Sequence, residues 1–221
     1  MAESLIQRYR SHYRDLAAQG PDAFFTGFDG GRTAEEYFQR AAWNYEHNIK
    51  AHIPADHGLT CLDLGYGGGG MLRAAADDYD TLHGLDVHGE RSLVSKYINH
   101  PDVRLYKSGG WLILRRPDSI SVLWSWVTFM HLESAGVAQS YLREIARVLA
   151  PGGTALIWYC PHEDDKRARE LPPQINKCSL QAGDGAMRKW AEAAGLTVQK
   201  IVNSKRQSGG GGWQHGMVMT K

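Results

Sequence analysis

A run of four glycines, Gly67 to Gly70, is the stretch of this sequence best suited to bind a ligand. It follows an apolar segment, residues 59–64, and leads into the helix-forming residues 71–76. This order predicts a strand, a tight turn and the start of a helix. Glycine permits positive φ angles and lets the backbone approach a ligand closely, and a helix N-terminus offers free N–H groups. The turn is therefore expected to receive a nucleotide-like ligand.

Two carboxylates flank this turn. Asp63 lies two residues before Gly65, and Asp86 ends a second apolar segment, residues 81–86, about 20 residues beyond the turn. That spacing places a carboxylate at the tip of the neighbouring strand, where it can accept both hydroxyls of a ribose. Gly65, Gly67 and Gly70 also satisfy the dinucleotide pattern G-x-G-x-x-G, which is weak evidence alone. A flexible linker and a nicotinamide or flavin site are the alternatives.

A third feature is the sequence Pro151-Gly152-Gly153, which ends a predicted helix and begins a strand. The glycine turn, the strand-tip acid and this Pro-Gly-Gly, in this order, resemble the class I S-adenosylmethionine-dependent methyltransferases over residues 57–221. The resemblance implies an enzyme that uses S-adenosylmethionine and releases S-adenosylhomocysteine. It also implies an α/β, Rossmann-like, seven-stranded, mostly parallel sheet with helices on both faces, an antiparallel C-terminal strand and an N-terminal helical extension.

The resemblance assigns a role to several residues of the first two strand ends. The backbone of the turn is expected to approach the methionine and ribose portions of the donor, Asp63 to orient the turn or the donor's ammonium group, and Asp86 to hold the ribose. Val87 and His88 are expected beside the adenine. The turn glycines concerned are Gly65, Gly67 and Gly69.

The third strand departs from the family pattern. Many relatives have an aspartate near its end that binds the adenine amino group, whereas this chain has Ser108-Gly109-Gly110-Trp111. Adenine recognition is then expected to involve Ser108, the backbone at Gly110 or stacking on Trp111. The missing acid and the short segment 109–117 also support another hypothesis, a cofactor-binding partner or regulatory subunit without its own acceptor site.

The fourth strand is predicted to end beside the donor. Ser125 and Trp126 occupy its tip, and His131 follows five residues later. A histidine with an ordinary pKa near 6.5 can remove the acceptor's proton at neutral pH, so His131 is the candidate general base. A structural histidine that orients the next helix is the alternative. The acceptor is expected to be a small organic molecule methylated on oxygen or nitrogen.

Hydrophobic periodicity places the supporting elements. Strands are expected near 59–64, 81–86, 102–107, 119–126, 154–160, 196–203 and 213–220, and helices near 3–18, 33–53, 69–78, 89–98, 134–149 and 179–194. An aromatic loop is expected near residues 20–31, a solvated helix over the charge run 161–170, and a mobile turn at Gly209–Gly212. We expect residues 1–56 to form a helical extension, either a lid over the cofactor or a cover for a sheet edge, and 57–221 a single methyltransferase domain.

Composition limits the other function classes. The formal net charge is +1, so no large basic field is available for nucleic acid. The three cysteines form no C-x-x-C pair, and no metal site is expected. No run approaches 18 apolar residues, and the N-terminus lacks a signal sequence, so we expect a cytoplasmic protein without membrane contact. A monomer or homodimer is expected.

Overall fold

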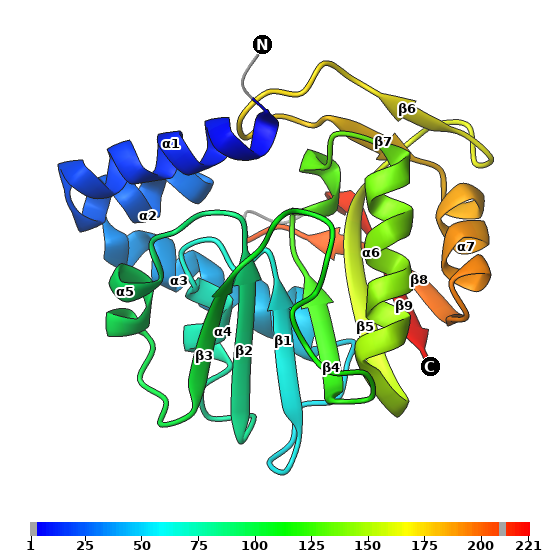
Figure 1. Cartoon of the computed structure of the whole chain (residues 1–221), viewed down its shortest axis with the longest axis horizontal. Helices are drawn as coiled ribbons and strands as arrows, with labels where there is room; N and C mark the ends of the chain where they lie inside the picture. Colours follow the sequence, from blue (N-terminus) through cyan, green and yellow to red (C-terminus); the bar gives the residue numbers. More distant parts are fainter. Residues whose placement is uncertain (1–3, 208–210) are drawn as a thin grey trace.

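Five apolar segments form the parallel part of a central sheet (Figure 1). In the computed structural model, which describes residues 4–207 and 211–221, they pair in the order β3-β2-β1-β4-β5. Strand order reverses between β1 and β4, and in open sheets a ligand crevice forms at such a point. The bounds are β1 Thr60–Leu64, β2 Thr81–Asp86, β3 Val103–Lys107, β4 Ile120–Ser125 and β5 Leu149–Pro161. The mostly parallel sheet predicted from the sequence is confirmed.

The C-terminal strands complete the predicted set of seven. β9 (Gly211–Thr220) runs antiparallel to both β5 and β8 (Thr197–Lys205). Two further short strands were not predicted: β7 (Leu180–Ala182) pairs with the end of β5, and β6 (Ala168–Glu170) pairs with β7. The solvated helix expected over 161–170 is therefore wrong. Gly209 and Gly210 of the predicted mobile turn lie outside the described residues.

Helices cover both faces of the sheet (Figure 1). α6 (Ala135–Val148) and α7 (Asp184–Ala193) pack their apolar side chains against one face, while α4 (Gly70–Ala74) and the N-terminal helices pack against the other. α5 (Arg91–Val94) and the 3-10 turn η2 (Ser95–Tyr97) connect β2 to β3. α7 begins later than the predicted residue 179 because Leu180 and Ala182, both buried, belong to β7.

Three helices and a π-helical turn precede the sheet. They are α1 (Leu5–Gln19), α2 (Pro21–Asp29), α3 (Ala34–Asn44) and η1 (Tyr45–Lys50). The loop expected near residues 20–31 is wrong, because α2 occupies it. Pro21 at the first helical position and Asp22 in the first turn favour a helix start, and Phe24 and Phe25 are completely buried.

The π-helical turn anchors these helices to the sheet. The buried Asn48 donates to and accepts from the backbone of Lys205 at the end of β8. Its carbonyl also accepts a hydrogen bond of 3.1 Å from the indole of Trp158 on β5. Tyr45 and Ile49 on the same turn are fully buried. These hydrogen bonds fix the N-terminal helices to β5 and β8 before the chain enters β1.

Candidate functional site

A cavity of about 230 Å³ lies at the carboxyl ends of β1, β2, β3 and β4, below α1 and α2. Its lining includes nine of the thirteen site residues predicted from the sequence. They are Asp63, Gly65, Gly67, Asp86, Val87, Ser108, Gly110, Trp126 and His131. The other four, Gly69, His88, Trp111 and Ser125, are not part of the lining.

The glycine turn is closed by hydrogen bonds within the protein itself. The N–H of Gly65 donates to the Leu85 carbonyl, and the N–H of Gly69 donates to the Tyr66 carbonyl, both at 2.7 Å. The N–H of Gly67 donates to Asp86, and that of Gly70 donates to the hydroxyl of Tyr37. The N–H groups at these four positions of the turn are therefore engaged within the protein.

The positive φ angles of the turn explain its glycines. They are +85° at Gly65, +53° at Gly67 and +74° at Gly69. A Cβ on Gly67 would lie 3.0 Å from the ring of Phe28, and one on Gly69 would lie 2.6 Å from Val94. The missing side chains therefore allow α2 and α5 to pack closely. Gly69 faces α5 rather than the cavity, so its predicted contact with the donor remains a prediction.

Asp63 lines the cavity, and one of its carboxyl oxygens is buried without a hydrogen-bond partner. Its side chain is only 2% exposed, and its Oδ1 has no hydrogen-bond partner. Burial raises the pKa of this carboxyl from 3.8 to about 8. The neighbouring indole of Trp124 lowers this pKa, but burial outweighs it. A buried acid without a cationic partner is costly, and a bound cation removes the cost. The ammonium group of an amino acid moiety fits this position.

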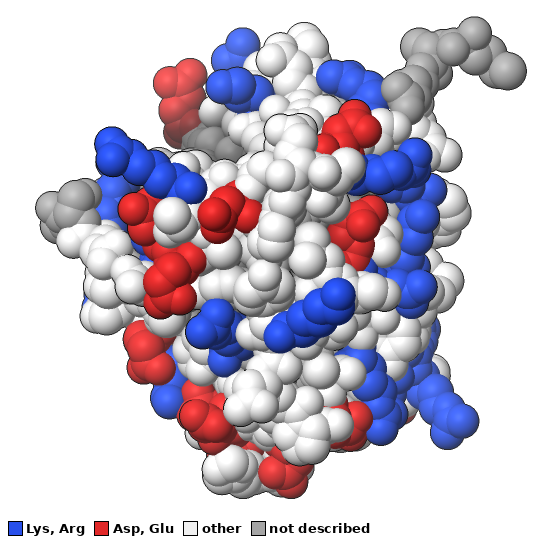
Figure 2. All heavy atoms as spheres, turned by 90° about the vertical axis from the view of Figure 1, so that its left-hand side faces the viewer, with Lys and Arg blue, Asp and Glu red and all other residues white. Residues whose placement is uncertain are grey.

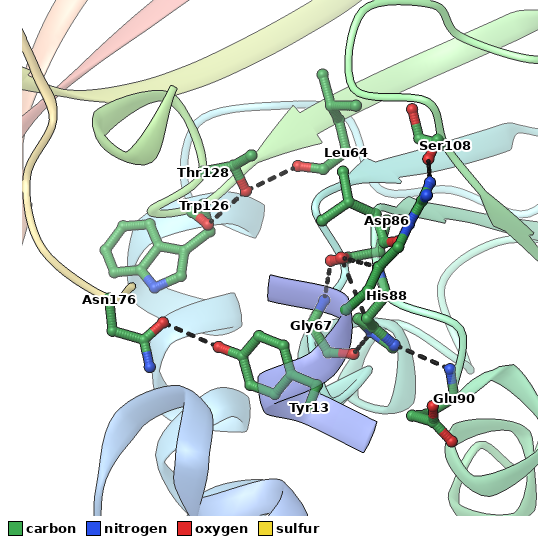
Figure 3. Close-up of polar contacts among 12 residues, drawn as sticks. Tyr13, Leu64, Gly67, Asp86, His88, Glu90, Ser108, Trp126, Thr128 and Asn176 are labelled. Atoms are coloured by element: carbon green, nitrogen blue, oxygen red, sulfur yellow. Dashed lines mark hydrogen bonds and ion pairs between the residues drawn. The ribbon is translucent and has the colours of Figure 1, made fainter. Parts of the chain in front are cut away.

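Asp86 is held in place by the turn that it faces. Oδ2 accepts from the N–H of Gly67 at 2.9 Å, and Oδ1 accepts from the N–H of His88 at 3.2 Å (Figure 3). The carboxylate lines the cavity, and it has no lysine or arginine within 4 Å among the described residues. Each oxygen keeps a lone pair for a further donor, which is what two ribose hydroxyls require.

His88 stabilises the glycine turn through a hydrogen bond to its backbone. Its Nε2 lies 2.9 Å from the Gly67 carbonyl, and its Nδ1 accepts from the N–H of Glu90 at 3.1 Å, so the ring is the Nε2–H tautomer. The side chain is completely buried and is surrounded by the rings of Tyr13, Phe24, Phe28 and Tyr66. A direct contact of His88 with adenine therefore remains a prediction.

The end of β3 presents backbone and hydroxyl groups to the cavity. Ser108 is buried, and its hydroxyl accepts from the N–H of Gly110 at 2.9 Å. Tyr141 of α6 lines the same region, and burial raises the pKa of its hydroxyl to about 12. Trp111 is 62% exposed and lies outside the cavity lining, so its predicted stacking on adenine remains untested.

The loop after β4 contains a strained residue that the sequence did not reveal. Val127 lines the cavity with φ at +65°, a conformation that β-branched residues rarely adopt. On either side of it, Ser125 and Thr128 both donate to the Leu64 carbonyl, at 2.8 and 3.2 Å. These bonds tie the β4 loop to the end of β1, next to the glycine turn, and Figure 3 shows the one from Thr128. Trp126 lines the cavity.

His131 lies in the 3-10 turn η3 (Phe129–His131), with one face on the cavity. Its Nδ1 lies 2.7 Å from the Lys177 carbonyl, which can only accept, so Nδ1 carries the proton and Nε2 has a free lone pair. Burial lowers the pKa of this histidine below 6.5. The ring is therefore neutral at pH 7 and has the tautomer that a general base requires.

Asn176 joins the segment between β6 and β7 to the N-terminal helices. Its side-chain oxygen accepts from the Tyr13 hydroxyl at 2.9 Å, and its N–H donates to the Tyr9 hydroxyl at 3.1 Å. Its amide group also donates to the Gly27 carbonyl of α2. Tyr9, Tyr13 and Asn176 all line the cavity, yet nothing in the local sequence marked them as site residues.

The described part of the chain has neither a metal-binding cluster nor a membrane-spanning helix. Within residues 4–207 and 211–221, no group of three His, Cys, Asp or Glu side chains could hold a metal ion. The helices described there include none long and apolar enough to cross a membrane. Figure 2 shows the side that carries α1, α2 and α5, where basic and acidic side chains are mixed.

Comparisons with known proteins agree with this geometry. Residues 62–157 match the model of a family described as a methyltransferase domain. A 2-methyl-6-phytyl-1,4-hydroquinone methyltransferase from Synechocystis is 25% identical over 155 residues, which are 69% of this chain and 46% of the relative. The chain thus spans about half the length of that curated relative.

Solved structures share the fold over nearly the whole chain. A putative methyltransferase from Haloferax volcanii, in complex with the Trm112 methyltransferase activator, has a TM-score of 0.66 and 18% identity, covering 100% of this chain and 98% of that one. An S-adenosylmethionine-dependent methyltransferase from Leishmania major has a TM-score of 0.71 and 14% identity, covering 99% and 83%. Residues 62–157 thus match a methyltransferase domain, and the chain shares its fold with S-adenosylmethionine-dependent methyltransferases of known structure.

Proposed function

We propose that this protein transfers a methyl group from S-adenosylmethionine to an oxygen or nitrogen of a small organic acceptor. The observation that supports the donor best is Asp63, which lines the cavity and has a buried carboxyl oxygen without a hydrogen-bond partner. An ammonium group would pair with it, and the ribose hydroxyls would bond to Asp86 at the neighbouring strand. The adenine would then lie toward Val87 and Ser108.

The glycine turn argues against an NAD(P)-dependent oxidoreductase, the alternative that its sequence left open. A pyrophosphate is bound by free N–H groups at such a turn. Here the N–H groups of Gly65, Gly67, Gly69 and Gly70 already have partners. S-adenosylmethionine has no phosphate and makes no such demand.

The protein's main task in this reaction is alignment. The donor supplies a methyl group that is already activated by its sulfonium, so the acceptor atom must be held in line behind it. Orientation of this kind can contribute about 7–11 kcal/mol. Nε2 of His131, if it faces the acceptor, receives the proton that the acceptor loses, while the Lys177 carbonyl keeps the ring in the required tautomer.

The side chains above the donor site favour a flat, apolar acceptor. Those from the N-terminal helices and the β4 loop include five aromatic residues: Tyr9, Tyr13, Phe28, Tyr37 and Trp126. Rings of this kind stack on planar molecules and exclude water. The hydroquinone named for the Synechocystis relative is an acceptor of this class. We further propose that residues 1–56 act as the lid of a domain formed by 57–221, in a cytoplasmic protein.

Calorimetry tests the donor directly. S-adenosylmethionine and S-adenosylhomocysteine are titrated into the protein in parallel with NADH and NADPH. We expect binding of both adenosyl compounds and no response to either nicotinamide. The opposite pattern would refute the proposal. If the donor binds, a mass-spectrometric search for metabolites that gain one methyl group identifies the acceptor.

One observation favours a second candidate function, a donor-binding partner of another protein. Trp111, Leu112 and Leu114, on the loop after the edge strand β3, are 62%, 42% and 48% exposed. Exposed apolar clusters mark interaction sites in many proteins. Co-purification of a second protein, together with S-adenosylhomocysteine binding but no turnover on any metabolite pool, would favour this function. Turnover by the isolated monomer would exclude it.

A further inference from the structure

A single arginine of α1 reaches across the adenine end of the cavity. Arg10 donates from Nε to the Val87 carbonyl at 3.0 Å and from Nη2 to the Ser108 carbonyl at 2.9 Å. Val87 and Ser108 directly follow the last residues of β2 and β3, and both line the cavity. One guanidinium thus joins the ends of two neighbouring strands.

Arg10 acts where the backbone pairing of the two strands stops. The last bond between them runs from the N–H of Ser108 to the Asp86 carbonyl, at 2.6 Å. The carbonyls of Val87 and Ser108 lie just beyond it. By bonding to both, the guanidinium fixes the spacing of the strand ends, as one further pair of ladder bonds would. Its planar, two-pronged geometry suits this task better than a lysine ammonium does.

α1 contacts both sides of the cavity: it packs against Gly110 at the adenine end and is hydrogen-bonded to Asn176 on the opposite side. Ile6, one turn before Arg10, packs on Gly110 so closely that Gly110 has no room for a Cβ. On its neighbouring face, α1 carries Tyr9 and Tyr13, which bond to Asn176 across the cavity. Arg10 is the charged member of a face that is otherwise apolar and aromatic.

This chain needs such a residue because β3 ends without an acid. The hydroxyl of Ser108 is used inside its own loop, where it accepts from Gly110 and donates to the Leu112 carbonyl. Asp86 is used by the glycine turn and by His88. Neither side chain fixes the separation of the walls between which a planar base would lie.

We propose that Arg10 is a positioning residue for the adenine of the donor. It sets the separation of the Val87 and Ser108 backbones and holds α1 closed across them, so the nucleoside leaves only after these two hydrogen bonds break. This proposal rests on the proposed donor, and it gives the N-terminal helix a part in placing the adenine at a strand end that lacks the acid found in many relatives.

The test compares Arg10→Ala and Arg10→Lys with Arg14→Ala, a matched control on an exposed position of the same helix. Affinities for S-adenosylhomocysteine and for adenosine are measured by calorimetry, and the dissociation rate of S-adenosylhomocysteine is measured by stopped-flow tryptophan fluorescence. Far-UV circular dichroism confirms that each variant is folded.

We expect Arg10→Ala to weaken both ligands by a similar factor, about tenfold or more, and to speed dissociation. Arg10→Lys should fall between wild type and Arg10→Ala, since one ammonium bonds poorly to two carbonyls, and Arg14→Ala should match wild type. Affinities within twofold of wild type, or a loss confined to S-adenosylhomocysteine, would overturn the role at the adenine. Failure of the wild-type protein to bind S-adenosylhomocysteine would instead refute the donor itself.

Discussion

The substitution Asp63→Asn distinguishes the cost in folding stability of burying this carboxyl group from its proposed role in binding the donor. Burial raises the pKa of Asp63 from 3.8 to about 8, so the folded protein keeps a proton that the unfolded chain loses. Such a group destabilises the fold progressively as pH rises from 3.8 to 8, by about 1.4 kcal/mol per pH unit. At pH 7 the cost is at most about 4 kcal/mol. Asn has the same shape and no charge, so it removes this cost.

A second buried group gives the opposite pH dependence in the acid range. Burial and the nearby Arg115 lower the pKa of His83, on β2, to about 4. The unfolded chain takes up a proton below pH 6.5 that the folded protein refuses, so stability is lost as pH falls from 6.5 to 4, by about 3 kcal/mol. In the wild type, the two effects oppose each other over this range.

Urea unfolding from pH 4 to pH 8 tests both effects together. Wild-type stability should fall by about 2 kcal/mol from pH 6.5 to pH 8. Asp63→Asn should remove that fall, and its stability should rise by about 3 kcal/mol or more from pH 4 to 6.5, because the lowered pKa values of His52 and His131 add to that of His83. The difference between the two proteins should grow with pH.

The same variant should lose donor affinity. Pairing with an ammonium group favours the carboxylate, so wild-type binding of S-adenosylhomocysteine at pH 7 should release a proton from Asp63. The heat of binding should then differ between phosphate and Tris buffers, and the difference should vanish in Asp63→Asn. Parallel stability curves for the two proteins, with no buffer dependence in the wild type, would refute the reasoning.

Three further substitutions test the other parts of the site. Asp86→Ala should cost about 2–3 kcal/mol in S-adenosylhomocysteine affinity by calorimetry, because it removes charge-assisted bonds to the ribose, and an unchanged affinity would exclude that contact. Gly67→Val should abolish binding and lower the melting temperature, since φ is +53° and a Cβ would meet Phe28 at 3.0 Å; normal binding would mean that the turn adapts. Once an acceptor is known, His131→Ala should slow methyl transfer by about 10²–10⁴-fold with donor affinity unchanged. Because burial lowers its pKa, the wild-type rate should fall only below pH 6.5, and full activity in the alanine variant would leave alignment as the mechanism.

The strands and the lower part of the site could be predicted because their signals are local. Residues 81–86 form β2 as expected, and β1, β3 and β4 lie within a residue or two of their predicted bounds. Apolar runs that end in Gly, Asp or Ser define both a buried parallel strand and its functional tip. The chain order of these tips was then sufficient to bring Asp63, Asp86 and Trp126 to one cavity.

Tertiary pairing decided the segments that were predicted wrongly. Glycines near residue 30 suggested a loop, but burial of Phe24 and Phe25 stabilises α2. The charges at 161–170 suggested a helix, yet Ala168–Glu170 pair with β7, which in turn pairs in parallel with the end of β5. A three-residue strand has almost no sequence signal of its own, because its stability comes from the partner strand.

The cavity has a floor, formed by the strand ends and the glycine turn, and a roof, formed by α1, α2 and residues 171–179. The contacts of the roof join segments that are far apart in the sequence. Arg10 lies 77 and 98 residues from the carbonyls it joins, and Tyr9 and Tyr13 lie 167 and 163 residues from Asn176. No periodicity within a segment encodes contacts of this range. In the proposed function, the floor binds a donor that is common to a large family, whereas the roof contributes most of the side chains that an acceptor would meet. The acceptor can therefore change through substitutions in α1, α2 and residues 171–179 that leave the glycine turn and its two acids intact, so a sequence motif identifies the donor far more readily than the acceptor.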